Sequence, residues 1–130
     1  MDSLVTINTI EKYINKPHIQ GQDDCILLVL DYLEQYDLRE QAQGRYTTIR
    51  GAKRVLPTLT EWKSLESFLE AFCDVVENGI VYDGDIVVHD FHSYIYWQCQ
   101  LFGIRNDKFK LSPINLPLSD EYKVYRKKAP

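Results

Sequence analysis

One unbroken apolar stretch constrains the fold more than any other part of the sequence. From Cys25 to Leu33 the chain reads Cys-Ile-Leu-Leu-Val-Leu-Asp-Tyr-Leu, and Asp23 and Asp24 come directly before it. Aspartate is a strong helix N-cap, so the stretch is predicted to be a helix that begins at Cys25. Because this helix is apolar on nearly every side, it should be the buried centre of a domain, although so short a run is also compatible with a strand.

Three further helices are predicted in the first part of the chain. Together with the central helix, the expected ranges are 4–16, 25–33, a helix within 44–56, and 58–76. Ser3 caps the first helix and Pro17 ends it, Pro57 closes the third, and Thr58 with Glu61 forms a capping-box pattern for the fourth. The third helix carries Arg50, Lys53 and Arg54 on one side, and this side is expected to be exposed.

The periodicity changes to that of strands after Asn78-Gly79. The expected strands are 80–82, 85–89, 93–101, 108–111 and 122–126. The last of these, followed by lysines, is expected to be an edge strand. Helices followed by an antiparallel meander predict an α+β fold, with N-terminal helices packed on a C-terminal β-meander. We expect a single domain over 1–130, in which 1–17 and 118–130 are candidates for peripheral segments.

Composition excludes several functional classes. Fifteen Lys and Arg against 19 Asp and Glu give a formal charge of −4, so the summed field repels phosphate backbones and no nucleic-acid partner is expected. No apolar run reaches the roughly 20 residues that cross a bilayer, and the N-terminus lacks the pattern of a signal peptide. We therefore expect a protein without a membrane span that is synthesised in the cytoplasm.

The three cysteines, Cys25, Cys73 and Cys99, form no Cys-x-x-Cys pair. An odd number without such a pair argues against a disulfide framework and a structural zinc site, so free thiols are expected. Cys73 and Cys99 should be buried. A metal site of Cys25, His89, Asp90 and His92 fits no zinc spacing, so neither a metal nor another cofactor is predicted.

Cys25 and His92 are the candidate catalytic pair. A thiol in the first turn of a helix is exposed to the helix dipole and to free backbone N–H groups, which lower its pKa. A histidine from another element must then reach it, and His92, just before the predicted strand 93–101, is the first candidate. His89 is the alternative base. A purely structural role is also open for both members of the pair. Cys25 would then be a buried core residue, and His92 a hydrogen-bonded histidine at the end of a strand.

Several motifs carry a resemblance to a known family. Gln22-Asp23-Asp24-Cys25, Gly84-Asp85-Ile86-Val87-Val88 and His92-Ser93-Tyr94-Ile95-Tyr96 are similar, in that order, to the motifs of NlpC-type, papain-like cell-wall cysteine peptidases. Gly44-Arg45-Tyr46, Arg50-Gly51-Ala52 and Arg54-Val55-Leu56 resemble a signature of a small phage and prophage tail protein family that is itself a divergent relative. These stretches span most of 20–114. The resemblance implies a papain-like NlpC-type fold, with Cys25 as nucleophile and His92 as general base.

The chain departs from the peptidase pattern in three places. Gly103 and Ile104 stand where the peptidases carry a polar residue that orients the histidine, so Asn106 or Arg105 would have to take that role. Tyr94 replaces the glycine of the His-x-Gly-Ile pattern, which places bulk beside the substrate groove. The paired carboxylates before Cys25 oppose the helix dipole and raise a thiol pKa.

Two functions follow from the resemblance. The first is a structural or assembly role at or near the tip of a bacteriophage tail, in which a degenerate peptidase site and aromatic strand residues contact other phage tail proteins. The second is an active cysteine endopeptidase that cleaves peptide bonds of peptidoglycan during DNA entry. Both place the protein in the virion tail, and we favour the first.

Overall fold

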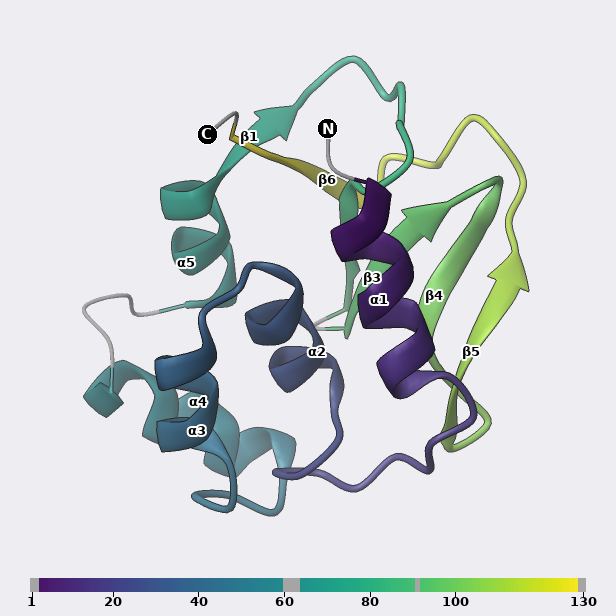
Figure 1. Cartoon of the computed structure of the whole chain (residues 1–130). Coiled ribbons are helices and arrows are strands. Elements are labelled where there is room, and N and C mark those ends of the chain that lie inside the picture. The colour runs from purple at the N-terminus through teal and green to yellow at the C-terminus, as the bar shows by residue number, and fades with distance from the viewer. Residues whose placement is uncertain (1–2, 60–63, 91, 129–130) are drawn as a thin grey trace.

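The computed structural model describes residues 3–59, 64–90 and 92–128 as an α+β fold. Five helices and a six-stranded antiparallel sheet lie within these residues, and the helices cover one face of the sheet (Figure 1). The helices are α1 (Ser3–Tyr13), α2 (Cys25–Tyr32), α3 (Tyr36–Ala42), α4 (Ile49–Leu59) and α5 (Leu65–Phe72). The strands are β1 (Cys73–Val76), β2 (Ile86–His89), β3 (His92–Trp97), β4 (Gln100–Arg105), β5 (Lys108–Pro113) and β6 (Lys123–Lys127).

The sheet has the strand order β1-β6-β2-β3-β4-β5. Strands β2 to β5 form the predicted meander, and β6 returns to pair with β1 on one side and β2 on the other. In the β2–β3 hairpin, Val88 pairs with Ser93 and His89 with His92. Ile95 of β3 pairs with Phe102 of β4. The start of β3 therefore lies beside the end of β4.

Alternation along the strands divides their side chains between two apolar clusters. The larger cluster packs the helices against one face of the sheet, and α2 is its centre, with every residue from Cys25 to Tyr32 buried. Helix α1 adds Ile10 and Tyr13 to it. The smaller cluster, on the other face, contains Val87, Tyr96, Leu101 and Val124, with Tyr94 and residues of the segment 114–122 packed against it.

Two predicted helix starts can be compared with the structure. The central helix begins at Cys25 behind the N-cap Asp24, which confirms a helix rather than a strand. The prediction of one helix over 58–76 is wrong, because α4 continues through Pro57 to Leu59 and α5 begins only after its own cap, Ser64. Glu61, half of the predicted capping box, lies outside the described residues. The end of that range, Cys73–Val76, is strand β1.

The remaining differences concern short elements. Helix α3 was not predicted, because it has only seven residues and its N-cap Gln35 makes no side-chain capping bond. The predicted strand 80–82 is irregular backbone. The predicted strand 93–101 is a hairpin that turns at Gln98 and Cys99, so Cys99 is exposed rather than buried. The last strand, β6, is an inner strand of the sheet rather than an edge strand.

No helix among the described residues is long and apolar enough to cross a bilayer.

Candidate functional site

Cys25 occupies the first position of α2 and is 7% exposed. The hydroxyl of Ser93, on the helix-covered face of β3, donates a hydrogen bond of 2.9 Å to the Cys25 carbonyl oxygen. This bond fixes the start of α2 against the start of β3. The cysteine thus lies at the start of a core helix, as predicted, and this start contacts the strand that begins with His92.

The loop that precedes Cys25 is organised around the buried carboxylate of Asp24. Asp24 accepts hydrogen bonds from the backbone N–H of Leu27 and of Gly21, each at 2.8 Å, and from the Tyr46 hydroxyl at 2.8 Å. Gly21 has a φ of +85°, and a Cβ there would lie 1.9 Å from the Tyr46 carbonyl oxygen, so a glycine is required. Asp24 is therefore the N-cap of α2, and it also joins the loop to Tyr46.

The surroundings of Cys25 disfavour a thiolate. Burial raises the pKa of the Cys25 thiol, hydrogen bonding from Ser93 lowers it and the charge of Asp24 raises it, and together they bring the pKa to about 11. Burial outweighs any benefit of the helix N-terminus, so the thiol is protonated at neutral pH. A cysteine in this state is a poor nucleophile unless a base removes its proton.

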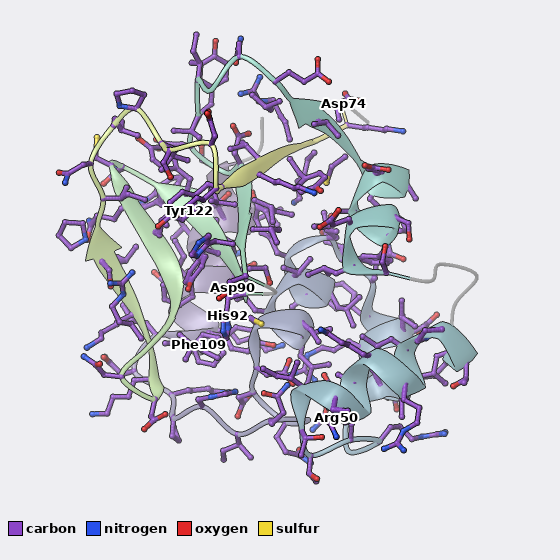
Figure 2. The ribbon with its side chains drawn as sticks, turned by 180° about the vertical axis from the view of Figure 1, so that it is seen from behind. Arg50, Asp74, Asp90, His92, Phe109 and Tyr122 are labelled. Carbon is purple, nitrogen blue, oxygen red and sulfur yellow. The ribbon has the colours of Figure 1, made fainter. Side chains whose placement is uncertain are left out.

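His92 begins β3 and is half-buried. Figure 2 shows it at the end of the sheet that faces α2, close to Asp90. Its neighbour Ser93 is bonded to Cys25, so the backbone at the start of β3 adjoins the start of α2, whereas the His92 side chain alternates to the face of the sheet opposite that of Ser93. Within the described part of the chain, however, the His92 ring makes no hydrogen bond. Among those residues, no side chain orients the imidazole through a hydrogen bond.

Tyr94 and Gly103 account together for two departures from the peptidase pattern. Tyr94 lies against Gly103, and a Cβ built at position 103 would come within 2.3 Å of Tyr94 Cδ1 and 3.0 Å of Cε1. Burial raises the pKa of the Tyr94 hydroxyl, while Arg105 lowers it. The aromatic ring thus fills the space that a histidine-orienting side chain at position 103 would need.

The alternative candidates have other contacts. His89 lies 3.6 Å from a carboxylate oxygen of Glu121, with its ring 4.7 Å from that of Tyr122. Asn106 is exposed in the β4–β5 turn, at the same end of the sheet as His92, but no described hydrogen bond joins the two. The roles of His92, His89 and Asn106 therefore stay predictions.

The aspartate of the Gly84-Asp85 motif has a structural contact. Asp85 is fully buried and accepts two hydrogen bonds of 2.9 Å from the Arg126 guanidinium, one to each carboxylate oxygen. It also accepts the Tyr82 backbone N–H at 2.9 Å. Asp85 therefore joins β6 to the segment before β2. The described residues hold no group of three or more His, Cys, Asp or Glu that could bind a metal ion.

Comparison with known proteins identifies a family without a known function. The family model described as Domain of unknown function (DUF6950) matches residues 5–116, which is most of the chain. The chain belongs to this family. No curated protein and no solved structure matches it. The matched range begins in α1 and ends after β5, so it contains Cys25, Tyr94 and Gly103, whereas β6 and its Arg126 lie beyond it.

Sequence reasoning missed two contributors to this region. Ser93 stands at a buried position between two half-buried strand residues, and a polar residue in such an alternation needs a hydrogen-bond partner, which here is Cys25. The contact between Tyr94 and Gly103 had no signal in the sequence. It requires the pairing of β3 with β4, whereas the sequence analysis predicted a single strand over 93–101 and none over 102–105.

Proposed function

We propose that this protein is a structural component of a bacteriophage tail, at or near its tip, built on a papain-like NlpC-type fold whose peptidase site is degenerate. The motif resemblance supplies the family of folds and the tail assignment. The α+β arrangement, with a cysteine at the start of a buried helix and a histidine at the start of a neighbouring strand, agrees with that resemblance.

The packing of Tyr94 on Gly103 is the observation that carries the proposal of a degenerate site. A general base in a thiol peptidase needs a third group behind the imidazole, and loss of that group commonly reduces turnover by orders of magnitude. Here the ring of Tyr94 takes the space at position 103, and the Cys25 thiol has a pKa of about 11. Both features lower the expected peptidase activity. The Tyr94 ring leaves no room for a group that orients the base, and the raised pKa of Cys25 leaves little thiolate.

An active cysteine endopeptidase is the second candidate. It is favoured by the position of Cys25 in the first turn of α2, where backbone N–H groups could stabilise an oxyanion, and by its proximity to the strand that begins at His92. In this alternative, His92 removes the proton from Cys25 during attack on a peptide bond of peptidoglycan.

Two experiments test the proposal. Mass spectrometry and immunogold electron microscopy of phage particles from a strain that carries this gene should find the protein in the tail. Purified protein and its Cys25→Ala variant should release the same background amount of peptide from peptidoglycan. Absence from the particles would refute the tail assignment, and release that depends on Cys25 would establish the peptidase instead.

A further inference from the structure

A hollow of about 230 Å³ lies between the start of α5, the end of β2 and the start of β6. Val88, from the helix-covered face of the sheet, and Leu65, from the first turn of α5, supply its apolar wall. Glu66, Asp90, Glu121 and Lys123 supply its charged wall. The volume is smaller than that of pockets for drug-sized ligands, so the hollow suits one side chain rather than a whole small molecule.

The hollow adjoins the start of α2. Val88 pairs with Ser93 across the β2–β3 hairpin, so their side chains are neighbours on the same face of the sheet. Ser93 in turn donates its hydrogen bond to Cys25. Figure 2 shows Asp90, from the same wall, close to His92. The hollow therefore lies beside the region that contains Cys25 and His92.

The charges around the hollow are unbalanced. Lys123 is 2.8 Å from Glu66, so these two neutralise each other and show that an ammonium group is accommodated there. Among the described residues Asp90 makes no ion pair, and Glu121 has only His89, at 3.6 Å. Two carboxylates are thus left beside an apolar wall. A side chain with an aliphatic stem and a positive end would match both parts.

We propose that this hollow binds a lysine or arginine side chain of a neighbouring protein, whose chain passes over the start of α2. The neighbouring protein would be another tail subunit, and this part of the inference rests on the proposed function. The aliphatic stem contacts Val88 and Leu65, and the cationic end approaches Asp90 and Glu121. The hollow then adds a recognition site beside the degenerate one.

Titration of the ¹⁵N-labelled full chain with three capped tripeptides tests the hollow directly. Each peptide has alanine on both sides of a central lysine, norleucine or glutamate. The lysine peptide should shift the amide signals of Leu65, Glu66 and Val88. Norleucine keeps the stem without the charge, so its peptide should bind roughly two- to five-fold more weakly, the scale of one partly exposed ion pair. The glutamate peptide should bind least.

Variants separate the charge from the shape of the hollow. Asp90→Asn combined with Glu121→Gln should abolish the preference for lysine over norleucine and leave norleucine binding unchanged. Lys123→Met frees Glu66 and should strengthen lysine binding. Equal binding of lysine and norleucine peptides, or shifts confined to other surfaces, would overturn the proposal. Both readouts use the isolated protein, so they stand or fail independently of whether the protein is found in tail particles.

Discussion

At position 103 the absence of a side chain allows the ring of Tyr94 to lie against the neighbouring strand. Gly103 is buried within β4 and is not among the glycines with a positive φ, so its backbone would accept an alanine. The cost of a substitution there must come from the contact of 2.3 Å with the ring. Tyr94 and Gly103 therefore form a matched pair.

Gly103→Ala should lower the free energy of unfolding by about 1–3 kcal/mol, because the aromatic ring has to leave its position. In a Tyr94→Ala background the same change should cost less than about 0.5 kcal/mol, because the clash is gone. Urea unfolding of the four proteins in this double-mutant cycle measures the coupling. Equal costs in both backgrounds would show that the two residues do not interact.

At the scale of elements, β6 is held in the sheet by an ion pair with a buried carboxylate as well as by its backbone. Arg126 contacts both oxygens of Asp85, a residue with 0% exposure, and its guanidinium carbon lies 4.1 Å from the centre of the Tyr82 ring. Removing one partner of such a pair leaves the other charge buried and unpaired. The pair therefore fixes the position of β6 between β1 and β2.

Arg126→Met should reduce the free energy of unfolding by about 3–5 kcal/mol, the usual cost of an unpaired buried carboxylate. Lys123→Met, on the same strand, is the matched control. Its ion pair with Glu66 joins side chains that are 56% and 50% exposed, and its loss should cost less than about 1 kcal/mol. Similar losses in the two variants would contradict this account of β6.

The sequence predicted elements with strong local signals and missed those that depend on pairing. Asp24 followed by an apolar run was sufficient to place the start of α2. The turn at Gln98 and Cys99 could not be read, because both residues adopt positive φ values, of 49° and 63°, without a glycine or an asparagine. The internal position of β6 depends on partners at distant positions, and lysines near a strand do not by themselves make it an edge.

The candidate site shows the same difference between local sequence signals and contacts that depend on packing. The cap at Asp24 was sufficient to place Cys25 in the first turn of α2, whereas the proximity of Cys25 to the strand that begins at His92 was implied only by the family resemblance. The protonation of the thiol could not be predicted from position alone, because burial opposes the helix dipole and only the packed structure gives the extent of burial. The amino-acid composition contributed even less to the prediction of the site, because it does not indicate which residues contact each other.

At the scale of the whole molecule, buried acids should make the fold sensitive to alkali. Burial raises the pKa of Cys25 and of Cys73 to about 11 from an ordinary 9.0, and that of Tyr32 and of Tyr125 to about 12 from 10.0. Above pH 9 the unfolded chain releases protons that the folded chain keeps. The free energy of unfolding should therefore be steady with respect to these groups below pH 8 and fall as the pH rises towards 11.

The expected fall is on the order of a few kcal/mol between pH 8 and pH 10.5, and the midpoint of urea unfolding measures it. A variant with both Cys25→Ala and Cys73→Ala lacks two of the four groups, so its midpoint should decline less over the same range. A midpoint that stays constant in the original protein would mean that these side chains are not shielded from water.

The reactivity of Cys25 towards an alkylating reagent, followed as a function of pH, tests most directly whether the cysteine is a nucleophile. The protein for this measurement carries Cys73→Ala and Cys99→Ser, so that only one thiol is present. The account predicts slow alkylation at neutral pH, with a rate that continues to rise beyond pH 10. A rate that reaches its plateau below pH 7 would reveal a stabilised thiolate and contradict the proposal of a degenerate site.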